Sequence, residues 1–464
     1  MIDPRVASGL RDIPPSAMIP RERMLEALRS TFSSFGFVPI ETPHIERLEV
    51  LTGKGAGSDE VLRQIFEVTN KGGTPGELAL RFDLTVPLAR FVAKHVDQLG
   101  TPFKRYAIGS VFRGERPAKG RFREFTQCDF DTVGTESPVS DAETAQLIHD
   151  ALAAIDVPAF SIHLNNRKIL DGLLDSFGVI DRKAAVLRAL DKLGKVGRDG
   201  VLKELTSHPR AVEPGGVPEG PTMPEADAAR LLDLVEQGKG PGDAVLSMAE
   251  SRLGPHETAR EGIANLRTVL DLLDAAGVPQ DRLKLDLGLA RGLDYYTGIV
   301  FETTVDGWER FGSISSGGRY DDLASLYIKR RLPGVGASIG LDRLLALMEE
   351  AGRLPSSATT APVLVAYFPG VSPTTPVRIA ARLRASGIGA EVYPEPISVG
   401  KQMGYGSTRG HAVAVIVGPD EEQAEVFNLR VLATRQEDKG LALSTLEDSV
   451  QSALGLLGSR PSAD

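Results

Sequence analysis

Several of the side chains that could do chemistry lie on one predicted strand, RFREFTQCDFD at 121–131. Successive side chains of a strand point to opposite faces. One face therefore carries a cation, an aromatic ring, an amide and two carboxylates, namely Arg123, Phe125, Gln127, Asp129 and Asp131. The other face has the composition of a core, with Phe122, Thr126, Cys128 and Phe130. The polar face suits one ligand held at several points, and the plainer alternative is a sheet with one solvated face.

Basic residues gather just before and within this strand. Residues 104–123 contain seven lysines and arginines and a single acidic residue, Glu115, although the whole chain has a net charge of −9. The turn that holds Arg116, Lys119 and Arg121 could bind a polyphosphate through charge-assisted hydrogen bonds. A solvated basic surface is the alternative.

Two further segments have polar residues at suggestive positions. ALRFDLTVP at 79–87 predicts a strand that ends at Pro87, with Asp83 and Thr85 on one face. LARGLDYYTGIVFE at 289–302 places one arginine, one aspartate and two tyrosines between glycines, namely Arg291, Asp294, Tyr295 and Tyr296. Such a cluster in a glycine-rich turn is more typical of a pocket than of a core.

A third segment, GVGASIGLDRLLALM at 334–348, predicts a glycine-flanked strand that leads into a helix. Arg343 falls in the first helical turn, away from the apolar stripe. A cation there interacts unfavourably with the helix dipole. A bound anion would explain it, and a surface arginine is the alternative.

The elements that must position these residues follow from hydrophobic periodicity. We expect helices over 20–36, 87–95, 141–155, 341–350, 376–386 and 443–457. We expect strands over 38–42, 79–82, 105–112, 121–133, 284–289, 299–305, 334–339, 363–368, 390–393, 412–417 and 427–435. Residues 167–283 are mostly helical in pattern, interrupted by a Pro/Gly-rich loop at 209–224. After a linker at 352–362, alternating strands and helices predict a small α/β domain.

Composition excludes several classes of protein. The 464 residues are 42% hydrophobic and 25% charged, which is typical of globular proteins and predicts roughly three folding units. The single cysteine, Cys128, cannot form an intrachain disulfide, and the seven histidines have no metal-site spacing, so we expect no cysteine- or histidine-based metal site. The apolar stretches are far shorter than the ~20 residues of a membrane span. Without an apolar signal segment at the start, the sequence favours a cytoplasmic location.

The segments together resemble class II aminoacyl-tRNA synthetases. The predicted helix at 20–36 with the strand ending at Pro43 resembles motif 1, FRGERPAKGRFREFTQCDFD at 112–131 resembles motif 2, and 334–348 resembles motif 3. RGLDYYTG at 291–298 and SSGGRYDDL at 315–323 resemble the two signatures of the histidyl-tRNA synthetase family. The resemblance covers 8–166, 284–350 and 361 to about 457.

The resemblance implies an α+β fold, with a six-stranded antiparallel sheet flanked by helices. It divides the chain into a catalytic domain in two parts, 1–166 and 284–351, a helical insertion at 167–283, and an α/β anticodon-binding domain at 361–464. It also implies a homodimer formed through motif 1.

The implied reaction has two steps. L-histidine and ATP, with Mg²⁺, give histidyl-adenylate and pyrophosphate, and the histidyl group then passes to tRNA(His). The residues implied to bind histidine are Asp83, Leu84, Thr85, Gln127, Asp131, Arg291, Tyr295 and Tyr296. Those implied to bind ATP are Arg113, Glu115, Arg121, Phe125 and Arg343.

Individual roles follow from the resemblance. Asp83, Thr85 and Gln127 match residues that hold the α-amino group, and Asp131 and Tyr296 match the pair that contacts the imidazole. The implied catalytic residues are three arginines: Arg113 at the α-phosphate, Arg343 at the γ-phosphate, and Arg291 near the histidine carboxylate and α-phosphate. Phe125 matches the aromatic ring that stacks on adenine.

One departure and two alternatives accompany the resemblance. Many bacterial members carry glutamate at the positions of Asp83 and Asp131, and the aspartates here resemble the form common in eukaryotes and some bacterial lineages, which affects tRNA details. A catalytically inactive paralogue could regulate histidine biosynthesis or sense uncharged tRNA. Such paralogues typically lose RGLDYYTG or the C-terminal domain, and this chain retains both. A class II synthetase for another amino acid is the second alternative.

Overall fold

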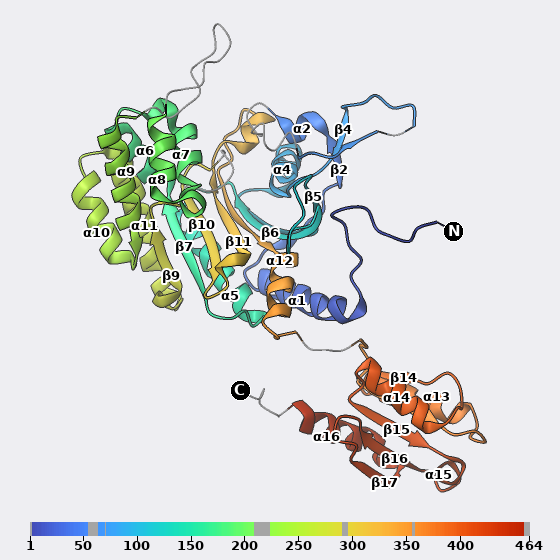
Figure 1. Ribbon diagram of the computed structural model, residues 1–464. Coiled ribbons are helices and arrows are strands. Elements are labelled where there is room, and N and C mark those ends of the chain that lie inside the picture. Colours follow the sequence, from blue (N-terminus) through green and yellow to red (C-terminus); the bar gives the residue numbers. More distant parts are fainter. Residues whose placement is uncertain are drawn as a thin grey trace. The chain divides into compact units, whose positions relative to one another are not determined.

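The structure is a computed structural model that describes residues 2–53, 64–69, 71–207, 223–289, 296–354 and 358–458. The chain forms two compact units (Figure 1). The first comprises Met1–Arg11 and Met24–Gly352, and the second Asp12–Arg23 and Arg353–Asp464. Within the described ranges, no helix combines the length and the apolar composition needed to cross a membrane.

A nine-stranded sheet is the centre of the first unit. Its strands, in spatial order, are β1 (Val38–Pro39), β5 (Phe103–Phe112), β6 (Glu124–Val133), β12 (Gly334–Gly340), β11 (Ser315–Tyr320), β10 (Ile299–Val305), β7 (Phe160–Asn166), β9 (Leu283–Asp286) and β8 (Lys239–Gly240). The six strands from β5 to β7 pair antiparallel throughout, which confirms the predicted antiparallel sheet. β1 and β9 add to its two ends in parallel, and β8 pairs with β9.

The long helix α1 (Pro15–Ser34) begins earlier than predicted. We expected Pro20 in its first turn, but Pro20 lies inside the helix. An internal proline removes one backbone hydrogen bond. The helix continues because Met24, Leu25, Leu28 and Phe32 form a buried stripe. The Phe32 ring packs 5.2 Å from that of Phe130, on the apolar face of β6.

The segment before α4 (Thr85–Leu99) corrects a second prediction. The expected strand through Asp83 and Thr85 ends earlier, as β4 (Leu78–Leu80), and Thr85 is the first residue of a helix. Pro87 is tolerated in this first turn because the amide hydrogen it lacks would have no intrahelical partner there. The Asp83 carboxylate accepts a hydrogen bond from the Val86 amide at 3.1 Å, as a capping side chain does.

Smaller elements complete the body of the first unit. β4 pairs with β2 (Ile45–Arg47) and β3 (Glu67–Val68) in a three-stranded sheet beside α2 (Leu48–Thr52). Two more helices that contact the large sheet are α5 (Pro138–Ala154) and α12 (Leu341–Glu350). Both match helices expected from periodicity.

The region between β7 and β9 is mostly helical, as predicted, over its described residues. Its helices are α6 (Arg167–Ser176), α7 (Lys183–Leu190), α8 (Leu193–Thr206), α9 (Glu225–Gln237), α10 (Gly242–Leu253) and α11 (Glu257–Ala275). Figure 1 shows them gathered beside β7 and β9. The predicted Pro/Gly-rich loop at 209–224 falls almost entirely outside the described residues.

The second unit contains the predicted α/β arrangement. Its sheet consists, in spatial order, of β14 (Ala390–Val392), β13 (Val363–Tyr367), β15 (Val413–Val417), β16 (Val426–Val431) and β17 (Glu437–Ala442). Residues from α13 (Thr374–Ala385) and α16 (Leu446–Gly458) share a core with Val363 and Val365. Met403 of α14 (Val399–Arg409) packs with Leu364 and Ala366 in another cluster. Alternate residues of β13 therefore contact helices on opposite faces.

Three elements of this unit were not predicted from the sequence. Residues 399–409 form helix α14 although the segment contains three glycines, because Met403 lies in an apolar cluster with strand residues. The predicted strand at 427–435 stops at Val431, and a further strand, β17, pairs with it. A short helix, α15 (Pro419–Gln423), lies between β15 and β16.

Candidate functional site

The polar face predicted for β6 exists, and it is buried. Phe125, Gln127, Asp129 and Asp131 alternate with core residues, but Gln127, Asp129 and Asp131 are only 9, 2 and 3% exposed. The alternative of one solvated face is therefore wrong over these positions. Buried carboxylates need partners, because removing a charge from water is costly.

Small residues on the neighbouring strands keep this face open. Asp131 is in register with Gly336 of β12, and Gly336 in turn with Gly318 of β11. A Cβ atom at Gly336 would overlap the Asp131 carboxylate. One at Gly318 would lie 2.8 Å from the ring of Tyr296. The two glycines therefore make room for the side chains of Asp131 and Tyr296.

Asp131 is held by two buried groups. The Arg105 Nη2 atom lies 2.5 Å from its Oδ2, and the Tyr320 hydroxyl donates a hydrogen bond to its Oδ1 at 2.6 Å. Burial raises the pKa of Asp131, while Arg105 and the Tyr320 hydrogen bond act to lower it. Each carboxylate oxygen has a second lone pair, so Asp131 can still accept a hydrogen bond from a ligand.

Besides Asp131 Oδ2, which is paired with the charge of Arg105, three buried oxygens of this region have no hydrogen-bond partner among the residues that the structure describes: Asp83 Oδ2, Gln127 Oε1 and Asp129 Oδ1. Buried polar atoms in proteins are almost always satisfied. Acceptors without donors are satisfied best by a ligand that carries several N–H groups, and an ammonium has three. Burial raises the pKa of Asp83 to about 6, although the Val86 amide, Arg113 and Arg105 act to lower it.

The buried Asp129 carboxyl affects how the free energy of unfolding depends on pH. Burial, together with Asp131 and Asp83, raises its pKa to about 7 from an ordinary 3.8, although Arg105 opposes the shift. The folded chain then binds a proton that the unfolded chain releases, so this group makes the free energy of unfolding fall as pH rises from about 4 to 7. Asp129→Asn, neutral at every pH, should stabilise the free protein by about 1–3 kcal/mol near pH 8 and by less near pH 5. Urea denaturation at both pH values measures the difference, and an equal effect at both would contradict the prediction.

The cationic side of the site comes from the hairpin β5–β6 and from α12. The Arg113 Nε atom donates to the Phe82 carbonyl at 3.0 Å, and its guanidinium lies 5.2 Å from the Phe125 ring centroid. Arg121, which is 52% exposed, lies 4.0 Å from Glu115. Arg343, in the first turn of α12, donates a hydrogen bond to the Ser313 carbonyl, in the segment just before β11.

Three more of the predicted histidine-binding residues lie in the described part of the chain. Leu84 is buried and packs against Ala107 and Val111 of β5. Thr85 is half-buried at the start of α4, and Tyr296 lies in an apolar cluster with Tyr320. Arg291 and Tyr295 lie outside the described residues, as does Asp294.

Sequence reasoning missed Arg105 and Tyr320. Arg105 was counted in a basic cluster, but its side chain is fully buried. Tyr320 ends the segment 315–320, which was not predicted as a strand. The register of the β5–β6 hairpin, which sets Arg105 opposite Asp131, was the available signal.

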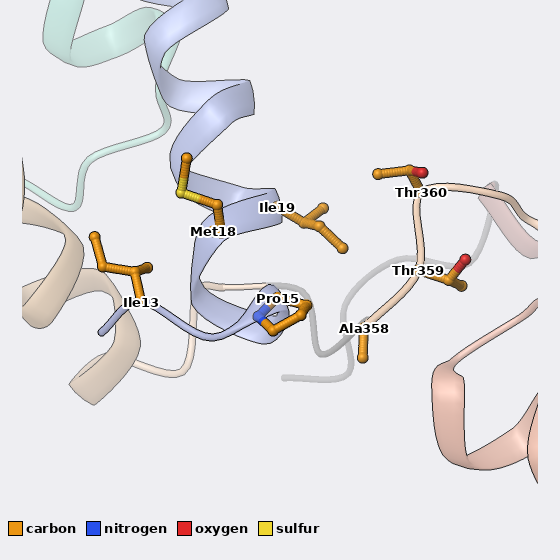
Figure 2. Close-up of a pocket in the computed structure, with 7 residues that line it drawn as sticks. All are labelled: Ile13, Pro15, Met18, Ile19, Ala358, Thr359 and Thr360. Carbon is orange, nitrogen blue, oxygen red and sulfur yellow. The ribbon is translucent and has the colours of Figure 1, made fainter. Parts of the chain in front are cut away.

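The described residues contain no metal centre beside this site. No group of three or more His, Cys, Asp or Glu side chains in those ranges could hold a metal ion. In the second unit a pocket (Figure 2) is lined only by apolar and hydroxyl-bearing residues: Ile13, Pro15, Met18, Ile19, Ala358, Thr359 and Thr360. It has no ionisable group with which to do acid–base chemistry.

The chain matches two known protein-family models. The family model "Histidyl-tRNA synthetase" matches residues 9–344, and the model "Anticodon binding domain" matches 374–453. The chain belongs to the histidyl-tRNA synthetase family. The predicted resemblance is therefore confirmed at the level of the family.

Three individual relatives are similar to this chain over almost its whole length. The "Histidine--tRNA ligase" of Rhodopirellula baltica is 49% identical over 436 residues, which cover 94% of this chain and 95% of the relative. A ligase of the same name from Wolinella succinogenes is 43% identical and covers 93% of this chain and 94% of the relative. The crystal structure of histidyl-tRNA synthetase from Nostoc sp. matches with a TM-score of 0.85 and 33% identity, over 97% of this chain and all of that one.

Proposed function

We propose that this member of the histidyl-tRNA synthetase family activates L-histidine with ATP and transfers the histidyl group to tRNA(His). The observation that carries the proposal is the buried polar face of β6. There, Asp131 is fixed by Arg105 and Tyr320, close to acceptor oxygens without donors. Carboxylates with perturbed pKa values gathered in one place are typical of functional sites.

In this proposal the polar face of β6 and the segment before α4 bind histidine. Asp83 Oδ2 and Gln127 Oε1 accept hydrogen bonds from the α-ammonium, as their lack of other partners suggests. Thr85 contributes its hydroxyl to the same group. Asp131 accepts a hydrogen bond from the imidazole, which offers nitrogens on opposite edges of its ring. Tyr295 and Tyr296 line the imidazole pocket, and Leu84 closes it from the apolar side.

The ATP site in this proposal lies along the motif 2 hairpin and α12. Arg113 and Arg343 neutralise phosphate charge, Phe125 stacks on adenine, and Glu115 and Arg121 contact the nucleotide. Magnesium bound with ATP would supply further positive charge at the phosphates. Glu302 fits this ion chemically, because Mg²⁺ prefers oxygen donors and Glu302 is in register with Ser316 and thus on the same face as Asp129.

Chemistry in the first step needs positive charge and no general base. The histidine carboxylate is already ionised, attacks the α-phosphorus, and pyrophosphate leaves. Arg113 and Arg291 stabilise the negative charge that builds on the α-phosphate oxygens, which is a common and large catalytic contribution. In the second step a hydroxyl of the terminal adenosine attacks the histidyl carbonyl, and AMP leaves.

The proposal extends to domains, assembly and location. The catalytic domain comprises 1–166 and 284–351, the insertion 167–283 and the anticodon-binding domain 361–464. The last contributes tRNA affinity, with Lys401 and Arg409 of α14 as exposed candidate contacts. The chain acts as a homodimer, and its use of tRNA and ATP fits a cytoplasmic location.

A regulatory paralogue is the less supported alternative. A chain titled as an ATP phosphoribosyltransferase regulatory subunit/histidyl-tRNA synthetase from Bacillus halodurans matches with a TM-score of 0.69, but at 22% identity this likeness shows the fold alone. Aminoacylation of total tRNA with labelled histidine tests the proposal. We expect label on tRNA that depends on ATP and on histidine. Failure to charge any tRNA with histidine, by protein that is folded, would contradict it.

A further inference from the structure

Arg105 is the largest fully buried side chain among the described residues. A guanidinium is almost always charged and carries five N–H donors, so burying it is costly unless it meets charges and acceptors. The contacts of Arg105 must therefore offset the cost of burying its charge.

Its contacts join two separate elements. Arg105 lies on β5, directly opposite Asp131 of β6, and its Nη2 atom is 2.5 Å from Asp131 Oδ2. The same Nη2 atom donates to the Leu84 carbonyl at 3.3 Å. Leu84 stands between Asp83 and Thr85, so its peptide groups fix the positions of both.

We propose that Arg105 is a positioning residue of the histidine site. Through the Asp131 carboxylate and the Leu84 carbonyl, it holds the element that contacts the imidazole and the element that contacts the α-amino group at a fixed separation. The inference rests on the proposed function, because it assumes that Asp83, Thr85 and Asp131 contact histidine. Arg105 itself acts through them.

The charge balance around Arg105 supports this role. Three buried carboxylates, Asp83, Asp129 and Asp131, each feel its positive charge, which acts to lower the pKa of all three. Without it, Asp131 would sit beside like charges and would take up a proton more readily. Lysine would supply the charge, but its ammonium is a point charge on a flexible chain and is not fixed in place as Nη2 of the planar guanidinium is.

The test compares steady-state pyrophosphate exchange in the full-length chain and its variants. Arg105→Met should raise KM for histidine by about 10²-fold, because misplacement of substrate-contacting groups by about 1 Å has effects of that order. The KM for ATP should stay within about 3-fold of wild type, since Arg105 contacts no group assigned to ATP. Arg105→Lys should restore part of the histidine affinity.

A matched control is available on the other face of the same sheet. Arg319 of β11 pairs with Asp141 of α5 at 2.7 Å, and both side chains are buried. Arg319→Met breaks a comparable buried ion pair and should lower the melting temperature to a similar degree. It should leave KM for histidine within about 3-fold of wild type, because Arg319 contacts neither Asp131 nor the segment 83–85.

A second variant tests the positioning role even if Arg105→Met does not fold. At pH 8, above the pKa of about 7 of Asp129, Arg105→Met with Asp129→Asn removes one positive and one negative charge from the same buried region, so the remaining charge is balanced as in wild type. We expect this variant to fold and to keep a raised KM for histidine, because balanced charge does not restore position. A return of KM to the Asp129→Asn value would overturn the positioning role and leave Arg105 as a counter-charge only.

The outcomes separate the two levels of inference. If wild-type protein shows no histidine-dependent exchange, the proposed function itself fails. If wild type is active and Arg105→Met binds histidine normally, only the role of Arg105 fails. If Arg319→Met raises KM for histidine as much as Arg105→Met does, the effect comes from general loss of sheet packing, and the positioning role is also wrong.

Discussion

Replacing Arg291 with alanine should lower the rate of histidyl-adenylate formation by about 10²–10³, equivalent to roughly 3–4 kcal/mol. In the proposed mechanism Arg291 neutralises charge that grows on the α-phosphate as the histidine carboxylate attacks. This stabilisation is greater in the transition state than in the ground state, so the loss should appear in the chemical step. Single-turnover formation of adenylate, measured by rapid quench, isolates that step.

Arg291 lies outside the described residues, so this expectation rests on its place in RGLDYYTG and on the neighbours that are described. Leu289 precedes the segment and is fixed by a hydrogen bond from Asn165 Nδ2 to its carbonyl at 3.2 Å. Tyr296, within the segment, packs with Tyr320. Arg260→Ala, at an exposed arginine of α11, is the control and should not affect the rate. A near-wild-type rate in Arg291→Ala would remove this arginine from the mechanism.

The second large effect is expected at Asp131. Asp131→Asn should weaken the use of histidine by on the order of 10²-fold or more, because a site built to hydrogen-bond a ligand group discriminates by that order. ATP affinity should hold. Asparagine is preferable to alanine, because its amide oxygen still accepts a hydrogen bond from the buried Arg105, whereas alanine removes that acceptor as well as the charge.

Measurement of KM for histidine and for ATP in the same exchange assay separates the roles of Asp131. A rise confined to histidine supports contact with the imidazole. An equal loss of ATP affinity in Asp131→Asn would show that Asp131 supports the sheet and does not select the substrate.

The alternation of β6 was predictable because the period of two survives in any strand, whatever surrounds it. The burial of its polar face was not predictable, since it depends on distant segments. The β5 hairpin partner, the glycines of β11 and β12, and the loop before α4 meet there only in the folded chain. For the same reason Arg105 looked like part of a solvated basic cluster, although its side chain is fully buried.

The errors in local structure have a common cause. Asp83 and Thr85 were predicted on a strand because Pro87 was taken as its end, yet a proline in a first turn is equally compatible with a helix. Helix α14 was missed because its three glycines lower helix propensity, by roughly 1 kcal/mol each relative to alanine. Tertiary packing of Met403 against strand residues offsets that loss. In both places the sequence pattern was compatible with more than one local structure, and tertiary packing determined which one formed.

The most direct test of the proposed function is ATP–pyrophosphate exchange with each of the twenty amino acids in turn, in the presence of Mg²⁺. Exchange reports adenylate formation alone, so it does not depend on obtaining the correct tRNA. We expect L-histidine to stimulate exchange strongly and the other nineteen to give only background. Stimulation by a different amino acid, or by none in a preparation shown to be folded, would contradict the assignment of the buried face of β6 as a histidine site.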